Sequence, residues 1–328
     1  MCIRDRGKYY LFGYDEILTV LGAEAGKKFC AYYGVTPKGN FEGRNILNRL
    51  HAKSGKDACD DLLPRLYEYR REREKLHLDD KILTAWNGLM IAALALLYRV
   101  TARQDYLSAA LTAQHAVETC LMENGRLCVS YRGGRRTGKA FLDDYAFYAA
   151  ALLGLYEATA DSACLEQAKA CCREADEQFR DADNGGYFLS GRENERLVLH
   201  LKETYDGAMP SGNAMMACLL VRLSQITEEP PWKQAAEEQL RFLSGESKPY
   251  PAGHSLYLLA LLLHDHPPDR ITVVPADPAE AGEVRRKLPL YAQVTVLDGP
   301  TGEYRLLDGK TTYYVCRRNT CLPPANTL

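Results

Sequence analysis

Polar and aromatic side chains gather at the starts of four apolar segments of this chain. Such starts suit a polar ligand, because the first turn of a helix has unpaired N–H groups and a partial positive charge. The residues found there are Asp79, Asp80, Trp86 and Asn87; Asp143, Asp144 and Tyr145; Asp206, Ser211 and Asn213; and His254. Sugar rings stack on Trp or Tyr, and sugar hydroxyls bond to Asp and Asn. Gathered in one concavity, these side chains would suit a carbohydrate.

Three of these residues are predicted to be catalytic. In an inverting hydrolase, Asp144 and Asp206 would act as acid and base about 6.5 to 9.5 Å apart. In an epimerase, His254 would be one of two bases beside a carbonyl, and Asp206 or a residue outside this sequence would be the other. The remaining candidates are predicted to bind substrate. They are Asp80, Trp86, Asn87, Asp143, Tyr145, Ser211 and Asn213.

The same residue types also have ordinary structural roles. Asp, Ser and Asn at helix starts are common N-caps, each worth about 1 kcal/mol. Asp143 is a cap candidate beside Asp144, and Asp206 precedes its helix, so Asp144 and Asp206 are expected to be free for chemistry. His254 has a second interpretation as a buried, hydrogen-bonded histidine, and Trp86 has one as a core residue.

Two kinds of helix must position these side chains. Four segments are apolar at nearly every helical position, which predicts inner helices buried all round. They are residues 79–100, 142–159, 210–223 and 252–263. Four amphipathic segments, predicted as outer helices, alternate with them. They are residues 57–74, 105–122, 164–179 and 232–243. This alternation predicts a mainly α fold, an arc of helical hairpins with an inner ring inside an outer ring.

Two insertions between helices and a C-terminal region with a strand pattern complete the predicted domain organisation. Residues 125–139 and, at greater length, 183–204 are predicted as hairpins that lead into inner helices. Beyond residue 267, three strands and a helix at 277–287 predict a small α/β domain. The predicted domains are a non-native leader (1–6), short helices and a loop (7–56), four toroid hairpins (57–266) and the α/β appendix (267–328).

Composition excludes several classes of partner. Lys and Arg number 41 and Asp and Glu 43, a net charge of -2, so no basic surface for nucleic acid or an acidic membrane is expected. No apolar run reaches the roughly 20 residues of a membrane span. The 11 cysteines follow no signal peptide, which predicts reduced thiols in the cytoplasm. No metal or cofactor motif is found, so neither is expected.

One cysteine pair stands apart from the others. Cys316 and Cys321 form a lone C-x4-C, which lacks the second pair of ligands that a tetrahedral zinc site needs. A structural role is the preferred interpretation, and a redox pair is the alternative.

Several motifs together resemble a known family. They are DDKILTAWNGLMIAALA, FLDDYAFYAAALLGLYEAT, NGGYF, DGAMPSGNAM and a terminal YVC-x4-CLPP. The chain resembles, over nearly all of residues 7–324, the thioredoxin-domain-containing family that includes spermatogenesis-associated protein 20 and bacterial YyaL-like proteins. The resemblance implies a thioredoxin-like domain followed by an (α/α)6 toroid similar to N-acylglucosamine 2-epimerases and six-hairpin glycosidases. That domain and the first hairpins have no counterpart here, which implies a C-terminal fragment and an incomplete toroid.

Two functions follow as hypotheses. The first is a carbohydrate-active or carbohydrate-binding toroid, epimerase-like or glycosidase-like, whose partners are a small sugar and the missing parts of the same parent chain. The second is a non-catalytic helical scaffold that accompanies the thioredoxin-like domain. In either case, a ring cut open would expose apolar inner-helix surface, which predicts self-association.

Overall fold

The computed structural model describes most of the chain. The described residues are 8–50, 52, 59–73, 75–76, 78–194, 199–280, 283–284, 287–289, 292–317 and 320–328. They divide into two compact units, Met1–Asp80 and Lys81–Leu328. The predicted leader at residues 1–6 lies outside the described residues. None of the described helices is long and apolar enough to cross a membrane.

The first unit is a small helical cluster. Its elements are β1 (Leu11–Phe12), α2 (Tyr14–Leu21), α3 (Ala23–Tyr32), β2 (Asn45–Ile46), the 3-10 helix η1 (Cys59–Leu62) and α4 (Leu63–Arg73). Ile17, Phe29 and Leu66 are buried in one core. The sequence pattern predicts residues 57–74 as an outer helix of the ring, but α4 packs on α2 in this unit instead. Its apolar residues complete the local core.

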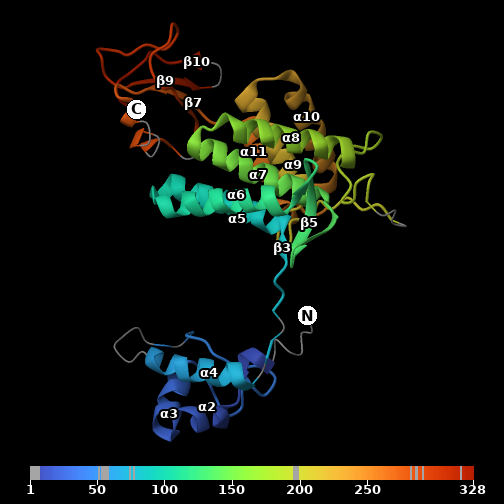
Figure 1. The fold of residues 1–328 in the computed structure, drawn as a ribbon, viewed down its shortest axis with the longest axis vertical. Helices are drawn as coiled ribbons and strands as arrows, with labels where there is room; N and C mark the ends of the chain where they lie inside the picture. The colour runs from blue at the N-terminus through green and yellow to red at the C-terminus, as the bar shows by residue number, and fades with distance from the viewer. Residues whose placement is uncertain are drawn as a thin grey trace. The chain divides into compact units, whose positions relative to one another are not determined.

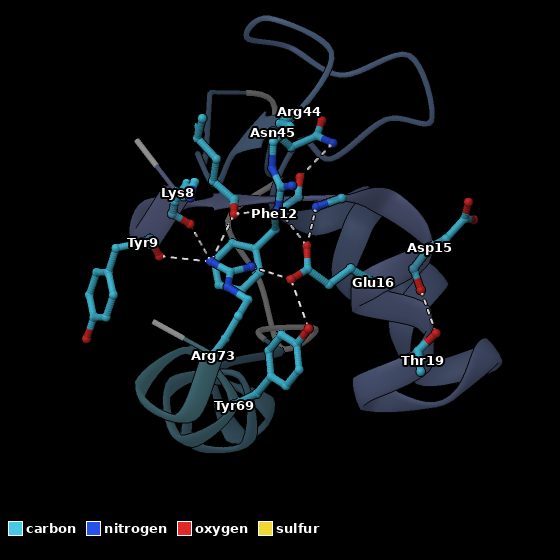
Figure 2. A network of polar contacts seen from close by, with 12 residues as sticks. Lys8, Tyr9, Phe12, Asp15, Glu16, Thr19, Arg44, Asn45, Tyr69 and Arg73 are labelled. Atoms are coloured by element: carbon cyan, nitrogen blue, oxygen red, sulfur yellow. Dashed lines mark hydrogen bonds and ion pairs between the residues drawn. The ribbon is translucent and has the colours of Figure 1, made fainter. Parts of the chain in front are cut away.

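A carboxylate network holds this cluster together (Figure 2). Glu16 accepts hydrogen bonds from the Gly13 amide at 2.7 Å, from Arg44 at 2.8 Å and from the Tyr69 hydroxyl at 3.0 Å. Arg73 forms an ion pair with the same carboxylate. Burial opposes ionisation of Glu16, but the Gly13 amide and Arg73 outweigh it and lower its pKa. The network therefore ties α4 to α2.

The second unit is an arc of helical hairpins (Figure 1). Its helices are α5 (Thr84–Thr101), α6 (Gln104–Cys120), α7 (Leu142–Thr159), α8 (Ser162–Phe179), α9 (Gly212–Thr227), α10 (Pro230–Ser247) and α11 (Ser255–Asp265). The inner helices α5, α7, α9 and α11 pack side by side in chain order, and α6, α8 and α10 each pack on the inner helix before them. The prediction of a mainly α, incomplete (α/α) toroid is confirmed.

The same turn closes each of three inner helices. Thr101, Thr159 and Thr227 donate their hydroxyls to the carbonyl four residues earlier, at 2.7, 2.7 and 2.9 Å. Each hydroxyl also accepts the N–H two residues later. The residue between is left-handed each time, with φ of 57° to 61°. This shared geometry shows that the tight hairpins run from inner to outer helix, and the longer loops from outer to inner.

Helix α7 forms the centre of the arc and approaches α5 very closely. Gly88 on α5 is buried, and a Cβ built there would lie 2.6 Å from the Phe147 carbonyl carbon and 2.8 Å from the Tyr148 nitrogen. Both neighbours are main-chain atoms, which have no rotamer to change. Only glycine therefore allows this packing.

We expect Gly88→Ala to destabilise the second unit by about 1–3 kcal/mol, because the added methyl group must push two buried helices apart. Urea unfolding would measure the loss. Gly154→Ala is a matched control on the facing helix, since a Cβ there would lie an ordinary 3.7 Å from its nearest neighbours. An unchanged midpoint for Gly88→Ala would show that the two helices do not meet as closely as described.

The predicted burial of all four inner helices holds only in the middle of the arc. Helices α7 and α9 are buried through most of their length. Helix α5 presents an exposed apolar stripe, Trp86, Met90, Leu97 and Val100, which are 60%, 58%, 41% and 58% exposed. On α11, Leu258, Leu259 and Leu262 are exposed as well. These faces are the unpaired inner-helix surface that an incomplete ring must show.

This chain on its own is expected to self-associate through the α5 stripe, because its apolar residues recur at spacings of four, seven and three along one face. Light scattering across a concentration series should show a mass above that of the monomer, and Leu97→Glu should restore the monomer. Leu111→Glu is the control, since Leu111 on outer helix α6 is also 41% exposed. A monomeric wild-type chain at all concentrations would refute the expectation.

The β elements of the second unit lie in two places. Strands β5 (Arg126–Arg132) and β6 (Arg135–Lys139) form the predicted hairpin, with β3 (Ile82–Leu83) and β4 (Met122–Glu123) paired to β5. The second insertion, residues 183–204, contains no named strand among its described residues, and 195–198 lie outside them. Tyr187 and Glu203, near its two ends, bond through main-chain groups to Asn213, as described below.

The C-terminal sheet confirms the three predicted strands. Its order is β10 (Thr320–Cys321), β9 (Thr312–Arg317), β7 (Arg270–Val274) and β8 (Gln293–Val296), with β7 and β8 parallel and the other pairs antiparallel. Of the predicted helix at 277–287, the structure describes the 3-10 turn η3 (Pro278–Glu280), while four of its residues lie outside the description. Val284 and Leu288 pack on the sheet.

Candidate functional site

The first turns of three inner helices are joined at one end of the arc. Asp143 at the start of α7 lies against Gly212 at the start of α9. The segment 203–206 runs past α9 and bonds to the start of α11. We call this region the N-terminal rim, made by Asp143, Glu203, Tyr205, Gly212, Tyr250 and His254.

Both carboxylate oxygens of Asp144 accept hydrogen bonds from backbone amides. Its Oδ1 accepts the Ala85 amide at 3.0 Å, and its Oδ2 accepts the Phe141 amide at 2.9 Å. The side chain is 3% exposed. Burial raises its pKa to about 7, while the two amides oppose the shift. Asp144 therefore caps α7 and anchors the first turn of α5.

Asp206 has the same kind of role between α9 and α11. Its Oδ1 accepts the Ser211 amide at 2.9 Å and its Oδ2 accepts the Leu256 amide at 2.7 Å. Its own amide donates to the Gly253 carbonyl at 2.7 Å. Both oxygens thus face helix backbones. Because Asp144 and Asp206 are both engaged in this way, the geometry does not support them as the acid and base of an inverting hydrolase.

Asp143 is the carboxyl of this pair that keeps one oxygen without a hydrogen-bond partner among the described residues. Its Oδ1 is buried and accepts no hydrogen bond from the described residues. Burial and the charge of Glu203 raise its pKa to about 6, although a hydrogen bond from the Gly212 amide lowers it in part. The expected order of the two residues is therefore reversed in one respect: the carboxylate of Asp144, and not that of Asp143, caps α7.

Gly212 makes room for that carboxyl. A Cβ at this position would lie 2.4 Å from Oδ1 of Asp143 and 2.9 Å from the Leu142 side chain. Any larger residue at the start of α9 would displace the Asp143 carboxyl. The glycine in SGN thus contributes to the site by lacking a side chain.

Two exposed tyrosines stack on each other farther along the rim. Tyr205 and Tyr250 are 58% and 57% exposed, and their rings are nearly parallel, with centroids 6.4 Å apart. Gly253 lies against both rings, since a Cβ there would be 2.4 Å from Tyr205 and 2.7 Å from Tyr250. Sequence analysis missed Tyr205 and did not select Tyr250, because neither belongs to a periodic segment.

His254 contacts both of these tyrosines. It is buried, its ring meets the Tyr205 ring edge-on at 87°, and its Nδ1 lies 3.0 Å from the Tyr250 carbonyl oxygen. A carbonyl can only accept, so Nδ1 is the donor in this contact. The second base proposed for it, Asp206, is engaged with helix backbones. The structure thus does not support His254 and Asp206 as an epimerase pair.

Asn213 and Ser211 have structural roles. The Asn213 amide bonds both main-chain groups of Tyr187, at 2.9 Å each, and the Glu203 carbonyl at 2.9 Å. It is fully buried and holds the second insertion against α9. Ser211 is the N-cap of α9, and its hydroxyl accepts the Ala214 amide at 3.2 Å. Neither side chain is available to bind substrate as predicted.

The remaining candidates have other surroundings. Tyr145 points into the core, where its hydroxyl accepts the Leu127 amide at 3.3 Å. Asn87 donates to the Leu83 carbonyl at 2.8 Å. Trp86 belongs to the exposed α5 stripe, and Asp80 is an exposed residue at the end of the first unit. Among the described residues, no group of three or more His, Cys, Asp or Glu could hold a metal ion.

Comparison with known proteins gives relatives that include spermatogenesis-associated protein 20 of several mammals. No family model matches the chain. Human spermatogenesis-associated protein 20 is 28% identical over 387 residues, which cover 97% of this chain and 48% of the relative. The rat protein of the same name is 31% identical over 268 residues, which cover 69% of this chain and 34% of the relative. The resemblance found in the motifs is confirmed, and the chain spans half or less of these relatives.

Solved structures of similar arrangement include two sugar enzymes. Cellobiose 2-epimerase of Bacillus thermoamylovorans matches with a TM-score of 0.43 and 16% identity, over 52% of this chain and 46% of that one. A family 76 glycoside hydrolase (mannosidase) of Bacteroides thetaiotaomicron matches with a TM-score of 0.41 and 15% identity, over 50% and 44%. The fold described above rests on contacts within this chain.

Proposed function

We propose that this chain, a relative of spermatogenesis-associated protein 20, binds a carbohydrate at the N-terminal rim and that Asp143 transfers a proton to or from the bound sugar. The reaction class is that of a glycosidase or an epimerase, as the sequence suggests. In either reaction the group required is a carboxyl that exchanges a proton near neutral pH.

The observation that carries the proposal is the state of Asp143. A buried carboxyl oxygen without a partner is costly, and native structures rarely keep one without a function. With a pKa of about 6, Asp143 is present in both protonation states near neutral pH. Glu203, whose charge contributes to that shift, supplies a second carboxylate beside it. Two carboxyls with different environments are the usual equipment for acid–base chemistry on sugars.

The tyrosine pair gives the site its affinity for a sugar ring. Parallel, half-exposed aromatic faces such as Tyr205 and Tyr250 offer apolar area to the C–H face of a pyranose while leaving its hydroxyls in water. The rim thus combines a surface for stacking with carboxylates for hydroxyl recognition. Glu203 and Tyr205 lie in a loop segment held in place by Asp206 and Asn213, and Asp143 lies in the first turn of α7.

A thermal-shift screen tests the proposal. Mono- and oligosaccharides, including cellobiose, mannotriose and N-acetylated hexosamines, would be added to the wild-type chain and to Tyr205→Ala. A ligand of the folded state raises the melting temperature by mass action. We expect at least one sugar to stabilise the wild type and to lose its effect on Tyr205→Ala, which is an exposed position that should not alter the fold.

A non-catalytic scaffold is the alternative, and the exposed α5 stripe favours it. An apolar helix face of this kind is typical of a surface that packs against another helix. Substitutions at different residues distinguish the two functions. If the scaffold alone is correct, no sugar stabilises the chain, Asp143→Asn changes no interaction, and Leu97→Glu disrupts association.

A further inference from the structure

The C-terminal sheet contains the disulfide that joins Cys316 to Cys321. The two residues lie directly opposite each other in the antiparallel pair β9–β10, with Cα atoms 4.0 Å apart. Reduced thiols are the sequence-based expectation for the whole chain, and this pair is the exception. The hairpin brings the two sulfur atoms together, because residues paired across a ladder project to the same side.

This disulfide is open to attack from solution. Cys321 is exposed and Cys316 is partly exposed. The eight free cysteines that the structure describes are buried or partly buried. Burial raises the pKa of Cys164 to about 11 and that of Cys218 to about 12, which keeps those thiols protonated and unreactive.

The bond also fastens the end of the chain. After Cys321, the Leu322 amide donates to the Val315 carbonyl at 2.8 Å, and Tyr313 and Ala325 exchange two backbone hydrogen bonds of 2.8 and 3.1 Å. These bonds hold residues 322–325 along the outer edge of β9. Besides the main chain, the disulfide is a covalent cross-link between the start of this tail and β9.

We propose that Cys316–Cys321 is a thiol–disulfide exchange site for a protein dithiol, and that its reduction releases the tail from β9. The partner is defined by chemistry as a dithiol of the Cys-x-x-Cys kind. Release would leave β9 with an open edge, which is the surface that accepts an added strand.

The exchange proceeds in two steps. A thiolate of the partner attacks Sγ of the exposed Cys321, a mixed disulfide forms, and Cys316 leaves as a thiolate. The second thiolate of the partner then attacks the mixed disulfide and releases Cys321. Two electrons pass from the partner, which becomes a disulfide, to the protein, and the partner's two thiol protons end on Cys316 and Cys321.

The sheet favours Cys316 as the leaving group. Arg270 on β7 is its register partner, so the two side chains leave the sheet on the same face. Arg270 also forms an ion pair with Glu228. A neighbouring guanidinium stabilises a thiolate, and a stabilised thiolate leaves faster.

Trapping a mixed disulfide tests the exchange. The oxidised full-length chain would be mixed with a thioredoxin whose resolving cysteine is replaced by serine, and adducts would be located by peptide mass spectrometry. We expect the adduct on Cys321 and none on the partly exposed Cys120, which is the internal control. An adduct on the free cysteines alone, or free thiols at 316 and 321 in chain purified without reductant, would overturn the proposal.

Hydrogen exchange tests the release of the tail. The amides of Tyr313, Leu322 and Ala325, which donate across the β9–tail contact, are expected to exchange at least tenfold faster after reduction. The double variant Cys316→Ser, Cys321→Ser should match the reduced wild type without any reagent, while the β7 strand amides stay protected. Equal protection of these amides in the oxidised and reduced chains would refute the release.

Discussion

Replacing Asp143 with asparagine is expected to stabilise the folded chain at pH 7.5 by about 1–3 kcal/mol while it abolishes the response to sugar. The carboxyl has a folded pKa of about 6 against an ordinary value of 3.8. The folded state therefore binds the proton more tightly than the unfolded state. Stability from this group is complete below about pH 4 and is lost as the pH rises through about 6. Asparagine cannot ionise, so it avoids that loss.

The measurement is the free energy of unfolding in urea at pH 5 and at pH 7.5. The wild type should lose more stability between these pH values than Asp143→Asn does. Asp144, whose pKa is also raised, is present in both proteins, so the difference between them reports the contribution of Asp143 alone. Asp161→Asn is the control, because Asp161 is the N-cap of α8 and its carboxylate accepts the Ala163 amide at 2.9 Å. Identical pH dependence in wild type and Asp143→Asn would contradict the raised pKa.

Asp206→Asn should do the opposite and destabilise the chain by about 2–3 kcal/mol, because one of the two amides that its carboxylate accepts, that of Ser211 or that of Leu256, would then face an NH2 group. Urea unfolding at pH 7.5 is again the measurement. A catalytic acid at this position would give a variant as stable as the wild type, or more stable, and that result would restore Asp206 as a candidate.

Sequence periodicity predicted the architecture well, because it reports burial directly. The apolar run of α7 could only be an inner helix, and the hairpin of β5 and β6 followed from alternation and paired glycines. The threonines at 101, 159 and 227 were a further signal of the repeat, since each closes an inner helix in the same way. Helix α4 escaped this reasoning, because an amphipathic helix does not reveal which core it covers.

The candidate site was harder to predict. Adjacent residues on a helix point about 100° apart, so the order Asp143–Asp144 does not show which carboxyl turns back to cap the helix. The answer depends on Ala85, a residue on another helix whose amide needs an acceptor. Tyr205 and Tyr250 lie in loops without periodicity, and only the folded chain stacks them.

The central claim is that the N-terminal rim holds a sugar next to the Asp143 carboxyl. The most direct measurement is titration calorimetry of the sugar that most stabilises the wild type, carried out on wild type and on Asp143→Asn at pH 6. We predict saturable binding to the wild type and at least a tenfold loss of affinity in Asp143→Asn, which remains folded by its urea midpoint. Equal affinity in the two proteins, or no binding of any sugar to folded wild type, would contradict the account.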